Sequence, residues 1–332
     1  MKKTAVSLIF VIIIILVIAL FPKKKEYSRS VAGALGTVST ITIYDDNEKA
    51  LNRCIDYINT ADKLFSAKNP ESEIYKLNNL RTSALSADTL ELLNSAIFYA
   101  DKDNFNPFLG SLINLWEDCK NNNTLPDQNE ISQLKNSGFP VSLEIANNTA
   151  SFLNPSQKVD LGAIAKGYIT NKLINILDEE DVDSSLIYLG GNIYAKGKKP
   201  DKSPWKIGIQ NPDDDSKYIG ILSLSDTAVI TSGDYQRYFE INGEKYHHIL
   251  DPKTGFPAKS ALRSVTIVIK DAFLGDVLST KCFIEGLHQS RDILKEYGAS
   301  AIFITDDNKV FYSKELENVF EINDSSYEYF TF

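Results

Sequence analysis

Two of the three histidines in this 332-residue chain stand side by side, as His247 and His248. They are followed by Asp251-Pro252 and by the turn-forming stretch KTGFP (Lys253–Pro257). The pKa of an unperturbed imidazole lies near neutral pH, so histidine is well suited to take up and return a proton there. Residues that end regular structure directly after the histidines indicate a reactive group held at the end of a strand. A surface histidine on a hairpin is the alternative interpretation.

A carboxylate and a hydroxyl, Asp276 and Thr280, lie four residues apart in DAFLGDVLSTKCFIEG (Asp271–Gly286). This segment is predicted to be a helix with Asp271 as its N-cap, and residues four apart share one helix face. Carboxylate and hydroxyl oxygens are hard donors of the kind that Mg²⁺ prefers. The pair is therefore suited to a magnesium site. The alternative is a Thr280 hydroxyl that donates to the Asp276 carbonyl within the helix.

The stretch VDLGAIAKGY (Val159–Tyr168) is predicted to be a strand, a turn and a helix start. Asp160 would end the strand, Gly162 permits a tight turn, and a helix would begin near Ala163. The N–H groups at such a helix start suit a phosphate. The helix dipole disfavours Lys166 in the first turn unless an anion compensates its charge. An ordinary turn with a solvated lysine is the alternative.

Two further turns follow predicted strands, in LGGNIYAKG (Leu189–Gly197) and in TSGDYQRYF (Thr231–Phe239). Paired glycines let a planar ligand approach the backbone closely. Hydroxyl and N–H groups converge in the second turn. Each stretch, taken by itself, also fits an ordinary turn with local side-chain hydrogen bonds.

The apolar periodicity predicts the elements that carry these residues. Helices are expected at Glu48–Phe65, Leu85–Ala100 with Ser86 as N-cap, LINLWEDCKNN, Gln128–Asn136, Ala163–Leu177, Asp271–Glu285 and Gln289–Tyr297. Strands are expected at Gly36–Asp46, Phe152–Leu153, Leu186–Leu189, Ile193–Ala195, Trp205–Gln210, Ile219–Leu224, Ala228–Ile230, Tyr238–Ile241, Tyr246–Leu250, Val265–Ile269, Ala301–Thr305 and Lys309–Tyr312. Asn242-Gly243 suits a type I′ hairpin turn. The prediction is an α+β fold with a large, mostly antiparallel sheet and flanking helices.

The composition narrows the class of protein. The formal net charge is −9 and the sequence has no long basic stripe, so nucleic-acid binding is not expected. Cys54, Cys119 and Cys282 are far apart and odd in number, which indicates small core residues rather than a disulfide framework or a zinc site.

An uncharged run of 17 residues, Ala5–Phe21, lies near the N-terminus between lysines. It is at the short end of what spans a bilayer, and it is too long for the apolar region of a signal peptide. We therefore expect one N-terminal transmembrane helix as an uncleaved membrane anchor over residues 1–22, a polar linker over residues 23–31 and one domain over residues 32–332. Because lysines flank both ends, the positive-inside rule does not give the orientation.

Eight stretches, in this order, resemble the ApbE-type FAD:protein FMN transferase family. They are Gly36-Thr37, FSAKNPESEIYKLN (Phe65–Asn78), NFNPFLGSLINLW (Asn104–Trp116), VDLGAIAKGY, LGGNIYAKG with WKIGIQNP (Trp205–Pro212), TSGDYQRYF, HILDPKTGFP and GDVLSTKCFIEG. Each is weak by itself, and eight in order make a chance resemblance improbable.

The resemblance implies an FAD-binding α+β domain outside the cytoplasm, dependent on Mg²⁺. It also implies transfer of FMN from FAD to a threonine hydroxyl of a target protein, with AMP as the other product. The target would be a flavoprotein subunit of a membrane redox complex or a secreted flavoprotein. Two alternatives stay open: an FAD pyrophosphatase that gives free FMN and AMP, and a non-catalytic, anchored FAD-binding protein.

The resemblance also implies roles for single residues. The residues that would contact FAD are Leu35, Asn106, Pro107, Phe108, Asp160, Lys166 and Ile249. The metal ligands would be the carbonyl of Ala163, Asp276 and Thr280, and the catalytic residues would be His248 and Asp251. The sequence departs from the family at Asn106, where aspartate is usual, and at Lys68, where an aromatic residue is usual.

Overall fold

The computed structural model describes residues 25–332. The apolar run Ala5–Phe21 lies outside these residues, and so does the side chain of Leu35. No helix within residues 25–332 is long and apolar enough to cross a bilayer. The membrane anchor over residues 1–22 therefore stays a prediction.

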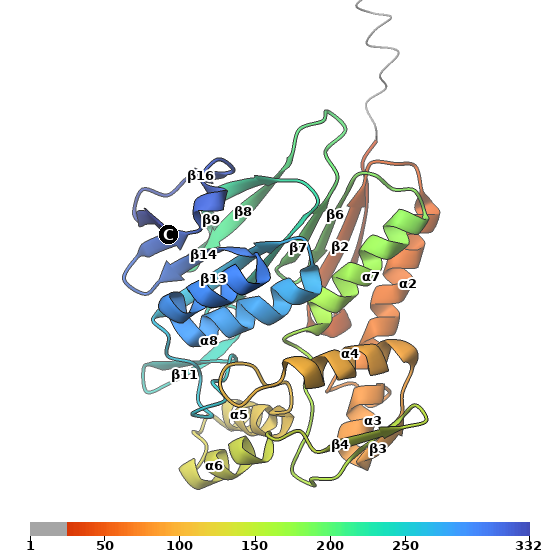
Figure 1. Cartoon of the computed structure of the whole chain (residues 1–332), viewed down its shortest axis with the longest axis vertical. Helices are drawn as coiled ribbons and strands as arrows, with labels where there is room; N and C mark the ends of the chain where they lie inside the picture. The colour runs from red at the N-terminus through yellow and green to blue at the C-terminus, as the bar shows by residue number, and fades with distance from the viewer. Residues whose placement is uncertain (1–24) are drawn as a thin grey trace, which may run out of the picture.

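A nine-stranded sheet forms the centre of the described part of the chain (Figure 1). Its order is β1-β2-β6-β7-β10-β13-β14-β15-β17, and all neighbours are antiparallel except β15 and β17. The strands are β1 (Tyr27–Ala32), β2 (Val38–Ile43), β6 (Ser185–Leu189), β7 (Asn192–Lys196), β10 (Thr227–Gly233), β13 (Leu262–Ile269), β14 (Ser300–Thr305), β15 (Lys309–Tyr312) and β17 (Glu328–Thr331). The predicted α+β fold with a large, mostly antiparallel sheet is confirmed.

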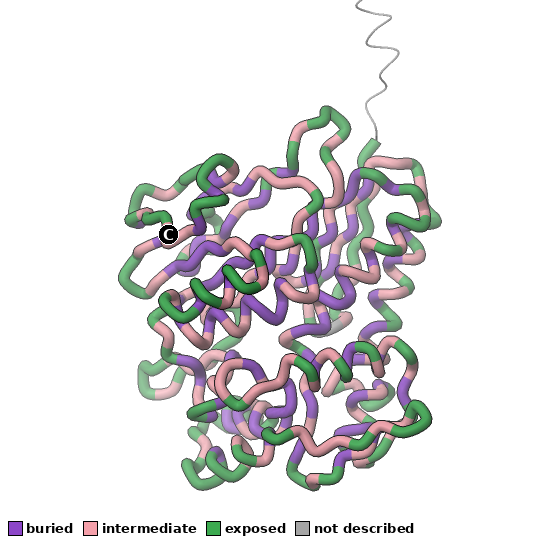
Figure 2. The backbone as a smooth tube through the Cα atoms, viewed as in Figure 1, coloured by how far each residue is buried: buried purple, intermediate pink, exposed green. Residues whose placement is uncertain are grey.

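Helices cover one face of this sheet and a smaller sheet covers the other (Figure 1). The helices are α2 (Glu48–Phe65), α7 (Ala165–Glu179) and α8 (Ala272–Tyr297). The smaller sheet contains β8 (Trp205–Asn211), β9 (Asp214–Leu224) and β16 (Phe320–Ile322). The central strands are therefore buried on both faces, as the purple tube in Figure 2 shows.

The residues between α2 and α7 form a second group of elements, below α7 and α8 in Figure 1. The group contains α3 (Glu73–Leu80), α4 (Ala87–Tyr99), α5 (Gly110–Asn122), α6 (Gln128–Ser137), β3 (Thr82–Ala84), β4 (Leu143–Ala146) and β5 (Thr149–Phe152). A hairpin, β11 (Tyr238–Ile241) and β12 (Glu244–His247), follows β10 of the central sheet and packs against α5 of the second group. Trp116 of α5 stacks on Tyr246 of this hairpin, with ring centroids 5.7 Å apart.

Several local predictions are confirmed by the backbone. Helix α2 has the predicted bounds. The side chain of Ser86 caps α4 by accepting a hydrogen bond from Thr89 N–H, and Asp271 caps α8 by accepting from two N–H groups. Asn242 and Gly243 both have positive φ, 52° and 80°, as a type I′ turn requires.

The first and the longest elements differ from the prediction. The sequence predicts a linker over residues 23–31, whereas Tyr27–Ala32 form the edge strand β1. The strand is polar because its outward hydroxyls pair across the ladder, as in Ser30 with Thr40. The two helices expected after Asp271 are the two halves of α8, which change direction at Gly286 with φ 78°.

Candidate active site

His248 follows β12 directly, at the position predicted for a reactive group at a strand end. Its ring Nδ1 lies 3.1 Å from the carbonyl oxygen of Arg237. A carbonyl can only accept, so Nδ1 carries the proton and Nε2 keeps its lone pair. The same carbonyl also accepts the backbone N–H of His248, at 3.1 Å. The backbone next to β11 thus fixes the tautomer that a general base needs.

Desolvation and nearby positive charge lower the basicity of this imidazole. The pKa of His248 is lowered to about 4, chiefly because neighbouring protein atoms desolvate the ring, although part of the residue remains exposed to solvent. The positive charges of Arg237 and Lys166 lower it further, while the hydrogen bond to the Arg237 carbonyl acts in the opposite direction. His248 is therefore neutral at pH 7 and able to accept a proton.

The neighbouring His247 has both ring nitrogens engaged by the protein. Its Nε2 donates to the carbonyl of Ala258 at 3.0 Å, and its Nδ1 accepts the N–H of Ile249 at 3.3 Å. The ring meets Phe283 edge to face, with centroids 5.4 Å apart. His247 is thus a structural residue that fixes the strand end from which His248 projects.

The candidate metal carboxylate, Asp276, is buried at the crossing of α7 and α8, with 4% of its surface exposed. Its Oδ2 accepts the N–H of Gly167 at 2.8 Å, and its Oδ1 lies 3.7 Å from the ammonium group of Lys166. A Cβ at Gly167 would lie 2.4 Å from the carbonyl oxygen of Ala272. Only glycine therefore permits the close helix contact that holds one carboxylate oxygen and leaves the other facing a cation.

The other two candidate ligands come from the same region. Thr280 lies one turn after Asp276 on α8, and Ala163 lies in the turn before α7. Ser279, rather than Thr280, donates to the carbonyl of Asp276, at 3.0 Å.

The three candidate ligands are all oxygen donors, the type of ligand that Mg²⁺ prefers. Among residues 25–332, no group of three or more His, Cys, Asp and Glu side chains could hold a metal ion. The candidate set would contain one carboxylate, one hydroxyl and one carbonyl. Such a set matches a metal that keeps several waters or substrate phosphates in its shell.

Asp160 connects this helix start to the loop before α5. Its backbone N–H donates to the carbonyl of Pro107 at 2.8 Å, and its Oδ1 accepts the N–H of Gly162 at 2.7 Å. The pKa of Asp160 is raised, chiefly by loss of water contact, although the Gly162 N–H lowers it. Two predicted FAD contacts, Asp160 and Pro107, are therefore adjacent in space.

Asn106 holds this loop in a way that an aspartate could not. Its Oδ1 accepts the N–H of Phe108 at 2.9 Å, and its Nδ2 donates to the carbonyl of Gly138 at 3.2 Å. A carboxylate could keep only the first of these bonds. Phe108 is 1% exposed and packs against Phe152, so its backbone is the part that could reach a ligand.

Asp251 and Ile249 hold the turn that follows the histidines. Asp251 accepts the N–H of Lys253 at 2.8 Å through its carboxylate and that of Gly255 at 2.7 Å through its carbonyl. Ile249 is buried, and its carbonyl accepts the N–H of Ala258 at 3.0 Å. The carboxylate of Asp251 thus has a turn-forming role in this structure.

Leu35, the first of the predicted FAD contacts, lies in the short helix η1 (Ala34–Gly36).

Charged residues outside the predicted set of site residues also act on the site. Arg237 donates to the carbonyl of Gly36 at 3.3 Å, which joins two of the eight stretches. Lys68 pairs with Glu117 of α5, and both charges act on the pKa of Asp160. Arg237 lies inside TSGDYQRYF, so its place in that stretch was the available signal.

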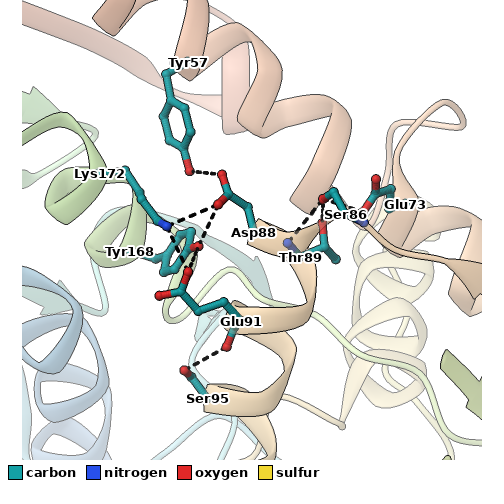
Figure 3. A network of polar contacts seen from close by, with 9 residues as sticks. All are labelled: Tyr57, Glu73, Ser86, Asp88, Thr89, Glu91, Ser95, Tyr168 and Lys172. Carbon is teal, nitrogen blue, oxygen red and sulfur yellow. Dashed lines mark hydrogen bonds and ion pairs between the residues drawn. The ribbon is translucent and has the colours of Figure 1, made fainter. Parts of the chain in front are cut away.

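A polar network on the other side of α7 fixes the helix that carries Lys166 (Figure 3). The hydroxyl of Tyr57 donates to Asp88 at 2.7 Å, and that of Tyr168 donates to Glu91 at 2.8 Å. Lys172 pairs with both carboxylates, at 3.2 and 2.9 Å. A polar cavity of about 410 Å³ adjoins this network and is lined by Tyr168, Lys172, Tyr194 and Phe273, among others. The cavity does not include His248 or Asp276.

Comparison with known proteins identifies the family of this chain. The model of the ApbE family matches residues 35–303. The chain is 33% identical to an FAD:protein FMN transferase of Treponema pallidum (strain Nichols), over 86% of each chain. It is 31% identical to one of Klebsiella pneumoniae (strain 342), over 92% of this chain and 97% of that protein.

Solved structures give the same result. The crystal structure of the ApbE protein of Thermotoga maritima superposes with a TM-score of 0.80 at 28% identity, over 89% of this chain and 99% of that one. The apo form of the flavinyl transferase ApbE from Pseudomonas stutzeri gives a TM-score of 0.77 at 25% identity, over 90% and 98%. With the family match spanning most of the described residues, the chain belongs to the ApbE family.

Proposed function

We propose that this protein transfers FMN from FAD to a threonine hydroxyl of a target flavoprotein, with Mg²⁺ and with release of AMP. The names of its relatives, FAD:protein FMN transferase, support the reaction. The observation that carries the proposal is His248, because its protonated Nδ1 leaves the Nε2 lone pair available. A storage protein for FAD would not require a base with a fixed tautomer.

The chemistry follows from these groups. The threonine oxygen forms a bond to the phosphorus of the FMN half of FAD, and the bond from that phosphorus to the AMP oxygen breaks. The threonine proton passes to Nε2 of His248, because a neutral hydroxyl is a poor nucleophile without a base. Lys166 lies where its charge can favour the diphosphate. Mg²⁺ held by Asp276, Thr280 and the Ala163 carbonyl would neutralise diphosphate charge and stabilise the leaving AMP.

The proposal is tested by incubating the full-length protein with FAD, Mg²⁺ and a candidate flavoprotein subunit of a membrane redox complex. A fluorescent flavin band on the target in a denaturing gel, with one AMP released per flavin attached, is the expected result. AMP and free FMN released without any target would instead identify an FAD pyrophosphatase. FAD binding with no AMP released would identify a non-catalytic FAD-binding protein.

We propose further that residues 1–22 anchor the protein in the cell membrane by a single span, with the domain on the extracytoplasmic side. The unbroken apolar run Ala5–Phe21 supports this. The full-length protein is expected to pellet with membranes and to resist a high-salt wash, whereas a chain that begins at Glu26 should stay in the supernatant. Release of the protein with a new N-terminus near Gly33 would show a cleaved signal peptide instead.

A further inference from the structure

Asn192 has a buried amide that the protein does not satisfy. The residue begins β7 directly after Gly190-Gly191 and is 1% exposed. Its Nδ2 has no access to solvent and no hydrogen-bond partner among residues 25–332. A buried donor without a partner destabilises the folded state. Such a group needs an explanation, and a ligand that supplies the missing acceptor is one.

The strand register places Asn192 on the helix-covered face of the sheet. Asn192 is directly opposite Leu189 on one side and Ile230 on the other, and residues directly opposite in a sheet point to the same face. Leu189 and Ile230 both belong to the core under α7. The side chain of Asn192 therefore points toward the helices that carry Lys166 and Asp276.

The same register places Asn192 close to the candidate metal carboxylate. Its cross-strand neighbour Ile230 packs against Gly275, where an added Cβ would lie 2.9 Å from the Ile230 side chain. Gly275 directly precedes Asp276 in α8. Ile230 is thus adjacent both to Asn192, across the sheet, and to the helix turn that holds Asp276.

A second buried polar group without a hydrogen-bond partner lies on the same row of directly opposite residues across the sheet. Ser39 of β2 is directly opposite Leu189, so its hydroxyl points to the same face as Asn192. Its Oγ is buried and has no partner among the described residues. Ser39 and Asn192 are separated by one strand, which places them about 10 Å apart. The row therefore has two free polar groups beside the Gly190-Gly191 turn, where Gly190 has no room for a side chain against Thr37.

We propose that Asn192 is a further ligand-binding residue, whose amide N–H donates to a diphosphate oxygen of the flavin dinucleotide. The inference rests on the proposed function. The diphosphate has to lie between His248, Lys166 and Asp276 for the transfer to occur. Asn192 is a buried, unpartnered N–H donor on the face next to that position, and phosphate oxygens are acceptors without a proton of their own.

The proposal predicts that one substitution, Asn192→Leu, preserves or raises the stability of the ligand-free protein and lowers its affinity for FAD. Asn192→Leu removes the unsatisfied amide and keeps the approximate volume, so the ligand-free protein should melt at the same temperature or higher. FAD should bind about 10-fold more weakly, the change that corresponds to one lost hydrogen bond to a charged group. Both quantities are measured on the full chain, by thermal unfolding without ligand and by fluorescence titration with FAD and Mg²⁺.

A titration with ADP and Mg²⁺ identifies the part of FAD that is bound. ADP carries the diphosphate without the flavin, so its affinity for Asn192→Leu should fall by a factor similar to that of FAD. A loss seen with FAD and not with ADP would place the contact on the flavin half and overturn the assignment to the diphosphate.

Ser185→Ala is the matched control. Ser185 is another buried hydroxyl without a partner on the same face, opposite Ile43, but four residues from Leu189 along β6, or about 13 Å away. This change should leave the affinities for FAD and ADP unaltered.

Two results would overturn the inference. A higher melting temperature of Asn192→Leu with unchanged affinity for both nucleotides would show that the amide holds only internal water. A strongly lowered melting temperature would show a structural role. Wild-type protein that binds FAD and ADP but forms neither AMP nor flavinylated target would refute the proposed function and leave this inference standing. Wild-type protein that binds neither nucleotide would overturn both.

Discussion

Replacement of Asp276 by alanine is expected to abolish magnesium-dependent AMP release from FAD. Asp276 supplies the one carboxylate in the candidate donor set, and a site with so few protein ligands does not tolerate the loss of its charge. The remaining hydroxyl of Thr280 and carbonyl of Ala163 are neutral. Measurement of AMP release at increasing Mg²⁺ should show no saturation by the metal, and calorimetry of Mg²⁺ binding in the presence of ADP should show no heat from this site.

Asp276 also accepts a hydrogen bond from the protein backbone, so a second variant is needed to separate loss of the metal from loss of folding. Its Oδ2 accepts the N–H of Gly167, and a buried N–H left without an acceptor costs about 1–3 kcal/mol. Asp276→Asn keeps an acceptor for Gly167 and removes the charge, so it should fold like the wild type and still lose Mg²⁺ binding. Thr280→Val should weaken Mg²⁺ binding less. AMP release at the wild-type rate by Asp276→Ala would exclude Asp276 from the metal site.

Local sequence signals predicted the helices and turns well. The apolar stripe of α2 was enough to predict this helix, because Leu51, Cys54 and Ile58 fill one face. Asn47 caps its N-terminus. The turn at Asn242-Gly243 is dictated by backbone conformations that few other residues adopt. These features depend on residues within a few positions of each other, so one sequence contains what is needed.

The edge strands were harder to predict because they depend on distant partners. Strand β1 reads as a polar linker, and it becomes a strand through pairing with β2 on the far side of η1. The last strand, β17, pairs in parallel with β15 across η2 and β16. Neither stretch has an apolar alternation of its own, because most of their side chains are exposed.

The site residues were found by resemblance, and their physical roles required the structure. Adjacent histidines look equivalent in the sequence, but His247 donates to Ala258 while His248 keeps a free Nε2. Asp234 could have been a base, but its carboxylate is held by Arg263 at 3.1 Å. The unsatisfied amide of Asn192 has no signal in the sequence, because burial and partners are tertiary properties.

Replacement of His248 by alanine is expected to lower the rate of FMN transfer by about 10²- to 10⁴-fold, the usual contribution of a general base. The affinity for FAD should change little, since the proton moves only in the transition state. Single-turnover flavinylation of a target subunit gives the rate, and a fluorescence titration gives the affinity. A fall in FAD affinity in proportion to the rate would make His248 a ligand contact, and the base would then have to be sought elsewhere.

Two variants separate the roles of the ring nitrogens. His248→Asn places an amide N–H where Nδ1 stands, so it can keep the hydrogen bond to Arg237 but lacks the basic Nε2, and it should be as slow as His248→Ala. His247→Ala loses the bond to Ala258 and the packing against Phe283. It should lower the melting temperature more than it lowers the rate per folded molecule.

The pH dependence provides the last test of the base. The pKa of His248 is lowered to about 4 in the free protein, and the base works only when neutral. The wild-type kcat/KM, which reports the free protein, should therefore stay level as pH falls through 6.5 and decrease only on approach to pH 4. The diphosphate of bound FAD is an anion and offsets Arg237 and Lys166, so the acidic limb of kcat should lie at higher pH than that of kcat/KM. Both limbs should be missing in His248→Asn. An identical acidic limb in wild type and variant would assign the titration to another group. The carboxyl of Asp160, whose pKa is raised, would be the first to examine.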